Sequence, residues 1–177
     1  GKKMTANDVA IDPGHFRSVL GHYPTGVCII TARSPANELF GLVVGSFTSV
    51  SLTPALIGFF PDQRSTSWPK IRACGGFCVN VIGSHQLDLC RQFAKPGDSK
   101  FEGISHRASP GGHPILDGCL AWIDCALHDE AAAGDHSLVL GRVNRLEVER
   151  GEQPLLFFRG DYGAFQALEA QAIAANG

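Results

Sequence analysis

Residues 41–52 carry the most informative pattern of apolar and polar positions in this chain. An apolar run at residues 42–44 predicts a buried β-strand, and beyond Gly45 hydroxyl side chains recur between apolar ones. A core strand has no use for these hydroxyls, because each buried O–H without a partner costs about 1–3 kcal/mol. The mixture is typical of the wall of a ligand site, where small hydroxyls and backbone N–H groups meet a polar ligand above an apolar floor. An ordinary strand with one solvated face is the alternative.

Helical periodicity and capping residues predict two or three helices. Asp12 followed by Pro13 indicates a helix start, with a capping carboxylate and a proline at the first helical position. Ser67, with Pro69 just inside, predicts the start of a second helix, and Ser84 predicts that of a third. The apolar residues of the first helix recur at helical spacing and are expected to face the core: Phe16, Val19, Leu20 and Tyr23.

Short apolar segments separated by turn residues predict about seven strands. Residues 95–118, rich in Gly and Pro, are expected to form one long, partly irregular excursion. The fold class is therefore mainly β: a closed or nearly closed antiparallel β-barrel with peripheral helices packed outside. The GxGxxG fingerprint of a Rossmann fold is absent from the sequence. The expected strands are residues 27–32, 42–44, 55–60, 76–82, 121–127, 137–149 and 154–159.

A chain of 177 residues is expected to form one domain. We place that domain at residues 13–165, between an N-terminal tail at 1–12 and a C-terminal tail at 166–177. The alanine-rich end of the second tail is expected to form a short helix or to fray. Gly1-Lys2-Lys3 ahead of Met4 looks like a cloning remnant and is left out of the fold argument.

The charge balance narrows the range of partners and compartments. A formal charge of −2 gives no electrostatic reason for nucleic acid or an anionic membrane as partner. No apolar run approaches the roughly 18–20 residues that span a bilayer, and no N-terminal secretion signal is recognisable, so we expect a cytoplasmic protein.

The six cysteines form no Cys-x-x-Cys pair and most lie in apolar runs. We interpret them as buried thiols of a reducing compartment, and no metal site is expected.

A second cluster of hydroxyls, Ser65, Thr66 and Ser67, comes directly before the second expected helix. A helix N-terminus carries unpaired N–H groups and about half a positive charge, which favours anions. Hydroxyl donors here, with Arg64 as a possible source of charge, therefore indicate an anion site. A plain capped helix is the alternative.

Taken together, these and other motifs resemble the short-chain flavin reductases, the reductase components of two-component flavin-dependent monooxygenases. The resemblance runs roughly from residue 16 to residue 165. It rests on an ordered series: Pro24-Thr25-Gly26-Val27, Gly45-Ser46-Phe47-Thr48-Ser49-Val50-Ser51-Leu52 with Pro54, Phe77-Cys78-Val79-Asn80-Val81, Lys100-Phe101 with Gly103, Gly134-Asp135-His136 with Gly141-Arg142-Val143, and Pro154-Leu155-Leu156-Phe157 continuing to Tyr162.

Resemblance to this family implies an FMN-binding split β-barrel that is usually a homodimer. It implies that NADH or NADPH reduces FMN or FAD, and that the reduced flavin passes to a separate flavin-dependent oxygenase. Carried over by position, Gly45, Ser46, Phe47, Thr48, Ser49, Ser51 and Leu52 line the flavin ring and ribityl chain. Ser65, Thr66 and Ser67 hold the phosphate, and Lys100 and Phe101 lie against the flavin. His136 and the segment from Arg159 to Tyr162 neighbour the nicotinamide.

Several readings stay open beside this one. A non-enzymatic module that stores or senses FMN could use the same barrel. An oxidase of the pyridoxamine-phosphate type would need a basic phosphate clamp, and the chain has few clustered Lys or Arg. His136 could be a structural hydrogen-bonding residue, Phe101 could anchor its loop, and bulky Trp68 is a candidate for selecting between FMN and FAD.

Overall fold

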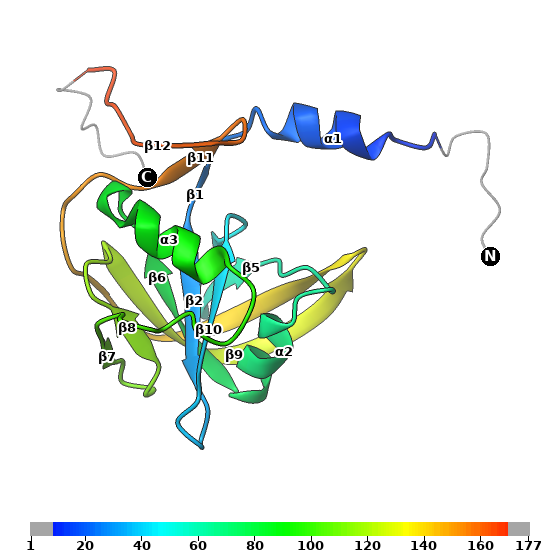
Figure 1. Cartoon of the computed structure of the whole chain (residues 1–177). Coiled ribbons are helices and arrows are strands. Elements are labelled where there is room, and N and C mark those ends of the chain that lie inside the picture. The colour runs from blue at the N-terminus through cyan, green and yellow to red at the C-terminus, as the bar shows by residue number, and fades with distance from the viewer. Residues whose placement is uncertain (1–8, 170–177) are drawn as a thin grey trace.

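The computed structural model describes residues 9–169. The expectations for the cloning remnant and for the alanine-rich end lie outside the described residues. Within them the chain forms a mainly β structure of twelve strands and three α-helices (Figure 1). The expected fold class, a β-barrel with peripheral helices, is confirmed.

The main sheet has seven strands in the order β3-β2-β6-β9-β10-β5-β4. Every pairing within it is antiparallel. The edges of the sheet are β3 and β4, two strands that follow one another in the chain, so the barrel is split between them. The strands are β2 Cys28–Arg33, β3 Leu39–Val44, β4 Thr48–Leu52, β5 Ala55–Phe59, β6 Gly76–Val81, β9 Ala121–Ala133 and β10 His136–Val148.

Strand β2 shows how the core is built on both sides of the sheet. Its apolar run leaves Cys28 to Ala32 almost fully buried, and successive side chains point to opposite faces. Ile30 joins the cluster inside the barrel with Phe59 and Phe77, whereas Ile29 joins a second cluster that includes Phe93 of helix α3. A continuous rather than alternating apolar run is what a strand covered on both faces requires.

Two helices cover this barrel, α2 at Ser67–Ala73 and α3 at Leu87–Ala94. Helix α3 lies close against β3, where a Cβ on Gly41 would come within 2.4 Å of the Phe93 ring. The capping predictions were wrong by one residue. Thr66 rather than Ser67 precedes α2, and Gly83 rather than Ser84 precedes the 3₁₀ turn at Ser84–Gln86 that leads into α3.

The remaining strands form two small sheets. Strands β7 (His106–Ala108) and β8 (Pro114–Leu116) pair inside the segment expected to be irregular, so that prediction was right only in part. Strands β1 (Thr25–Gly26), β11 (Leu156–Phe158) and β12 (Asp161–Gly163) form a three-stranded ribbon in the order β1-β11-β12. In Figure 1 this ribbon lies at the top of the barrel, above α3.

Helix α1 (Pro13–Leu20) begins where the sequence predicts, because Asp12 caps it by accepting a 2.9 Å hydrogen bond from the His15 N–H. The expectation that its apolar residues face the core was wrong. Figure 1 shows the helix projecting away from the barrel as an arm, and none of its residues is buried. Periodicity identifies residues that share a helix face, but it does not identify what packs against that face. The exposed side chains are Phe16, Val19, Leu20 and Tyr23.

Candidate functional site

A cavity of about 430 Å³ lies at the split of the barrel, between the end of β3 and the loop that follows β5. It brings together Gly45 and Ser46 from the first hydroxyl segment and Ser65 from the second. His136, at the start of β10, lines the same cavity. The two hydroxyl segments therefore share one site, although a strand separates them in the chain. The carboxylate of Asp62 and a set of mostly apolar residues complete the lining: Leu42, Val43, Val44, Thr25, Phe60 and Pro61.

Local packing holds the first hydroxyl segment in place. Gly45 passes so close to Thr25 that a Cβ at this position would lie 3.0 Å from the Thr25 Oγ1. The Ser46 Oγ accepts a 2.9 Å hydrogen bond from the backbone N–H of Phe60, which ties the β3–β4 link to the end of β5. These contacts fix the backbone around the cavity mouth, and a rigid frame is what a ligand site needs. Ser46, Phe47 and Thr48 also line an adjoining hollow of about 550 Å³ that reaches Tyr23.

His136 is held by its immediate neighbours. Its Nδ1 lies 2.7 Å from Asp135 Oδ1, and its backbone pairs with Asp62 in an isolated bridge. A proton on Nδ1 facing the carboxylate leaves Nε2 of the neutral ring as an acceptor. Arg64 does not line this cavity, because its guanidinium turns back onto Asp62 at 3.2 Å and 91% of its side chain is exposed. That hydrogen bond from Arg64 lowers the pKa of the Asp62 carboxyl.

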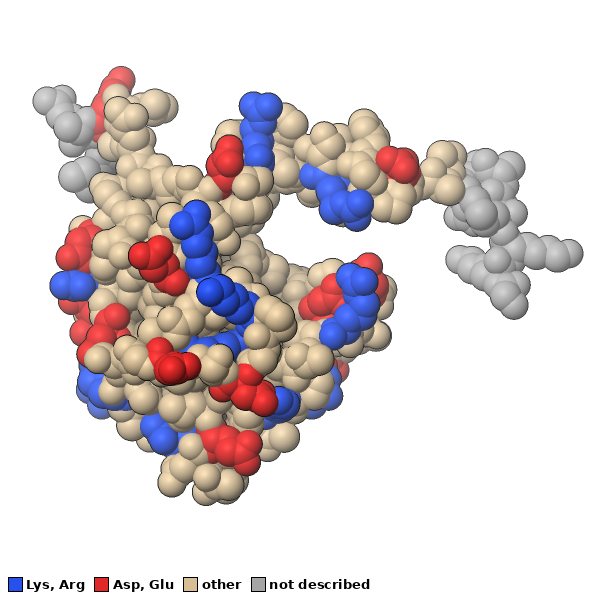
Figure 2. Space-filling model, viewed as in Figure 1, with Lys and Arg blue, Asp and Glu red and all other residues tan. Residues whose placement is uncertain are grey.

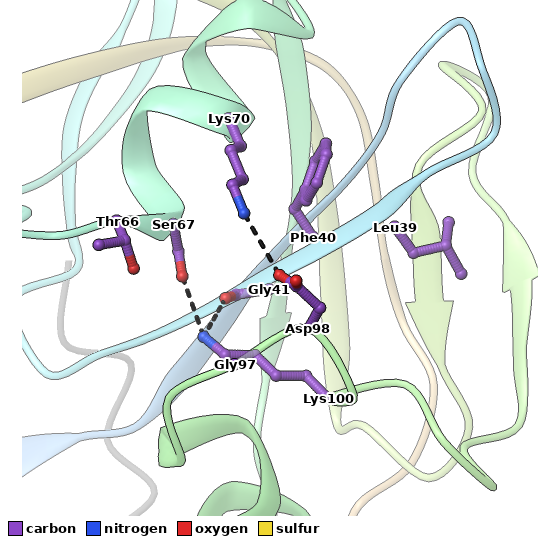
Figure 3. Close-up of a pocket in the computed structure, with 9 residues that line it drawn as sticks. All are labelled: Leu39, Phe40, Gly41, Thr66, Ser67, Lys70, Gly97, Asp98 and Lys100. Carbon is purple, nitrogen blue, oxygen red and sulfur yellow. Dashed lines mark hydrogen bonds and ion pairs between the residues drawn. The ribbon is translucent and has the colours of Figure 1, made fainter.

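Thr66 and Ser67, the other two hydroxyl residues of the second cluster, line a smaller hollow of about 70 Å³ (Figure 3). Lys100 enters it from the loop after α3, and its Nζ lies 2.8 Å from the Gly41 carbonyl and 3.0 Å from Ser67 Oγ. An ammonium group has three donors, so one N–H of Lys100 remains free. Partial burial lowers the pKa of Lys100, and the nearby Lys70 lowers it further.

The hydroxyls of the second cluster keep protons to donate. Ser65 Oγ accepts a 3.1 Å hydrogen bond from the Trp68 N–H, and Ser67 Oγ accepts from Lys100. A hydroxyl that accepts in this way can still donate its own O–H. With the free N–H of Lys100, this donor set suits an anion with several oxygens, such as a phosphate.

The two hollows adjoin along β3. Residues 42–44 line the larger cavity, and Leu39, Phe40 and Gly41 line the smaller one. At about 3.3 Å per residue, Gly41 and Gly45 are roughly 13 Å apart along the strand. An apolar-floored cavity at one end and a donor-rich hollow at the other match a flat ring system with a phosphorylated tail. The residues present therefore fit a flavin mononucleotide.

Four of the expected site residues line none of the hollows and lie on the edge strand or under α3. Ser49, Ser51 and Leu52 lie on the edge strand β4, where 95% of Leu52 is exposed. Phe101 packs edge-on against Phe93 at 4.9 Å and joins the cluster under α3, as a loop anchor would.

Three further candidates have side chains that line neither of these two hollows. Arg159 and Tyr162 line a separate hollow of about 660 Å³ next to Pro24. Trp68 is 2% exposed and donates to Glu130 from its indole N–H. Its ring packs against Phe59 in the core, so its side chain lines neither hollow, and a role in selecting between FMN and FAD stays a prediction.

Sequence reasoning missed several residues that the tertiary structure brings to the site. Thr25 and Phe60 line the larger cavity, and Lys70 and Asp98 line the smaller one. The motif containing Thr25 was recognisable, but nothing in its spacing shows that it meets Gly45. Lys70 and Asp98 carry no motif at all, since they lie 28 positions apart and meet only through the packing of α2 and the 95–100 loop.

Two classes of feature are not found among residues 9–169. No group of three or more His, Cys, Asp or Glu side chains there could hold a metal ion. Nor is any helix in this part of the chain long and apolar enough to cross a membrane.

Comparison with known proteins identifies relatives over nearly the whole chain. The model of the flavin reductase like domain matches residues 20–166. A flavin reductase of Pseudomonas putida is 54% identical over 90% of this chain and 94% of its own length. The reductase subunit HsaB of a flavin-dependent monooxygenase from Rhodococcus jostii is 46% identical over 86% of this chain and 78% of its own.

Solved structures agree with the sequence matches. The NADH:FAD oxidoreductase SgcE6 of Streptomyces globisporus, in complex with NAD and FAD fragments, superposes with a TM-score of 0.82 at 30% identity, covering 92% of this chain and 99% of that one. The family resemblance drawn from the sequence is confirmed, and so is the split-barrel fold. The chain belongs to the flavin reductase-like domain family.

Proposed function

We propose that this protein is an NAD(P)H-dependent flavin reductase, which reduces FMN or FAD with NADH or NADPH and supplies the reduced flavin to a separate flavin-dependent oxygenase. Membership of the family supports the reaction class, and relatives named as reductase subunits of monooxygenases support the oxygenase partner. The observation from this chain that carries the proposal is the shared cavity of Ser46, Ser65 and His136, joined to the cationic hollow of Lys100.

Hydride transfer is chemistry that the flavin and nicotinamide themselves supply when bound, so the protein needs no nucleophile of its own. Its residues bind and orient the two rings. Backbone N–H groups of residues 45–52 are assigned to the ring edge that gains negative charge, where fixed dipoles are most effective. Gly45, Ser46, Phe47 and Thr48 are the best placed of these, since they line the hollows at the split.

The phosphorylated tail is assigned to Ser65, Thr66, Ser67 and Lys100, which supply hydroxyl donors and one charge. His136 is assigned to the nicotinamide side of the ring, where it closes or orients the pocket. The assignments of Ser49, Ser51 and Leu52 to the flavin, of Phe101 to its cover, and of Arg159 and Tyr162 to the nicotinamide rest on the family resemblance.

The reaction itself is tested by adding NADH or NADPH to the protein with an excess of FMN or FAD and following the nicotinamide absorbance. Oxidation of many equivalents per protein is the expected result. A protein that binds flavin tightly and oxidises no nicotinamide would instead be a storage or sensor module. Comparison of both nucleotides against both flavins identifies the preferred pair.

We also propose that the protein is a homodimer, and the projecting arm supports this. Phe16 and Tyr23 are 56% and 73% exposed, and Figure 2 shows the arm overhanging an open recess beside the barrel. A helix of eight residues is marginal in water without packing partners, and burial of a large apolar side chain contributes about 1.5–3 kcal/mol. A second copy of the chain would supply the missing cover.

Sedimentation velocity tests the dimer with a double variant, Phe16→Asp with Val19→Asp. The wild type is expected to sediment as a dimer and the variant as a folded monomer, because two carboxylates cannot be buried in an apolar contact. Ser18→Asp, on the opposite face of the same helix, is the control and should leave the dimer intact. A monomeric wild type would contradict the proposal.

We place the protein in the cytoplasm. All six cysteines are free thiols, and five of them are buried. Free buried thiols are typical of proteins from reducing compartments.

A further inference from the structure

The smaller hollow contains a carboxylate where the proposed function puts an anion. Asp98 Oδ1 lies 3.3 Å from Lys70 Nζ, and both residues line the hollow together with Ser67 and Lys100 (Figure 3). In Figure 3 the Lys70 and Lys100 ammonium groups converge on this hollow from α2 and from the loop below. One of its two cations is thus paired with an acid from the chain itself.

The size and exposure of the group limit what its role can be. At about 70 Å³ the hollow has room for a group of phosphate size, whereas an adenine base would have to lie outside it. The Asp98 side chain is 93% exposed, and the Lys70 side chain is 48% exposed. An exposed pair of this kind contributes little to folding, so Lys70 can exchange Asp98 for another anion at little cost in stability.

The backbone of the loop directs Asp98 toward Lys70. Gly97, which directly precedes it and also lines the hollow, has a φ of +108°, a conformation that L side chains rarely adopt. The turn therefore depends on glycine, and it presents the next carboxylate to the cation.

We propose that Asp98 competes with the flavin phosphate for Lys70. Its carboxylate pairs with the Lys70 ammonium and repels a phosphate that enters the hollow. This inference rests on the proposed function, because it takes the smaller hollow as the phosphate subsite. Lys100 and Ser67 attract the tail, whereas Asp98 weakens its binding without touching the cavity of the ring. A reductase that releases its product flavin to another protein benefits from a phosphate subsite whose affinity is limited in this way.

Binding of two flavins that differ only in the phosphate tests this inference. The dissociation constants of FMN and riboflavin are measured by isothermal titration calorimetry at low ionic strength for the wild type and for Asp98→Asn. Removal of one negative charge within a few ångströms of a phosphate is expected to tighten FMN about three- to ten-fold. Riboflavin has no phosphate, so its dissociation constant should change less than about two-fold. The gain for FMN should shrink as salt is added, because the interaction is ionic.

Glu102→Gln is the matched control, since Glu102 is an exposed carboxylate of the same segment that does not line this hollow. It should leave both dissociation constants unchanged. The inference is overturned if Asp98→Asn leaves FMN binding unchanged or weaker, or if riboflavin tightens as much as FMN. It is overturned too if the wild type binds FMN no more tightly than riboflavin. In each of these cases, continued oxidation of NADH with added flavin would leave the proposed reductase function standing.

Discussion

Polar side chains in the closed wall of the barrel and at its open edge differ in how fully they are hydrogen-bonded within the protein. In the wall, formed by β2, β6 and β9, Asn80 and Thr31 are fully buried, and their side chains are saturated with hydrogen bonds. At the open edge, Ser65, Ser67 and Lys100 face hollows that lie along β3, and they keep donors to spare.

This difference separates groups that specify the fold from groups available to a ligand. A saturated buried polar group stabilises one arrangement of the core, because every alternative leaves it unpaired. A preorganised donor with no protein partner can bind a ligand at little cost in reorganisation. Substitutions in the wall should therefore change the stability of the protein, whereas substitutions at the edge should change ligand binding.

Truncation in the core that the wall encloses should have the largest effect. Phe59 is fully buried and packs edge-on against Trp68 and Phe77 at 5.4 and 5.3 Å. Phe59→Ala is expected to lower the free energy of unfolding by about 3–5 kcal/mol, because it leaves a cavity among these rings. Urea denaturation measures the change. Phe165→Ala, at a 55% exposed position, should change the free energy of unfolding by less than about 0.5 kcal/mol. Equal losses of stability in the two variants would contradict the expected difference between buried and exposed positions.

Removal of a saturated polar group should cost somewhat less. Asn80 Oδ1 accepts a 2.8 Å hydrogen bond from the Leu116 N–H, and its Nδ2 donates to the Ile29 carbonyl at 3.1 Å. Asn80→Ala leaves the Leu116 N–H buried without its partner and removes a side-chain hydrogen bond from the Ile29 carbonyl, which is expected to cost about 1–3 kcal/mol. The same denaturation experiment on Asn144→Ala, at an exposed position of β10, serves as control. A neutral Asn80→Ala would mean that the network can rearrange.

Substitution at the edge should change kinetics rather than stability. His136→Ala is expected to raise the KM for NADH about three- to ten-fold, because one hydrogen-bonding group at the proposed nicotinamide side contributes about 1 kcal/mol. Flavin affinity should change less than this KM, as shown by steady-state kinetics beside flavin titration. His128→Ala, an exposed histidine of β9, should leave both values unchanged. Weaker flavin binding with an unaltered KM for NADH would assign His136 to a flavin or structural role.

The smallest effect is expected where the wall meets solvent. Glu130 accepts two 2.7 Å hydrogen bonds from Arg72 and one of 3.0 Å from the Trp68 indole. The hydrogen bonds from Arg72 lower the pKa of Glu130 below its ordinary value of 4.5, and that from Trp68 adds to the effect. A lowered pKa in the folded state contributes stability above the ordinary value, and that contribution is lost as the pH falls through the folded-state pKa.

Arg72→Met should therefore lower the free energy of unfolding by about 0.5–1 kcal/mol at pH 7. The difference from the wild type should vanish as the pH falls below 4.5 and through the folded-state pKa of Glu130. Denaturation curves across this range measure it, with Arg145→Met at an exposed position as control. A difference that persists in acid would show that Arg72 acts through packing rather than through the ion pair.

Local chemistry was enough to predict much of this fold. The apolar run of β2, the Asp12 cap and the turn residues between strands act on neighbours in the chain, so their effects can be predicted without knowing the rest of the molecule. The hydroxyl pattern of residues 41–52 also indicated a ligand wall. Hydroxyl side chains in an otherwise apolar strand need hydrogen-bond partners that the strand itself does not supply. The ordered motifs identified the family.

Only the tertiary structure decided which surfaces meet. The periodicity of α1 gave its apolar face but could not show that the helix projects from the barrel. Trp68 directly follows the hydroxyls of residues 65–67 in sequence, yet its side chain turns into the core, because a helix places successive side chains about 100° apart. Lys70 and Asp98 meet across 28 positions, and contacts at such separation depend on how α2 and its neighbouring loop pack. Sequence patterns describe what each segment can bury or bind, and packing determines which partner each segment finds.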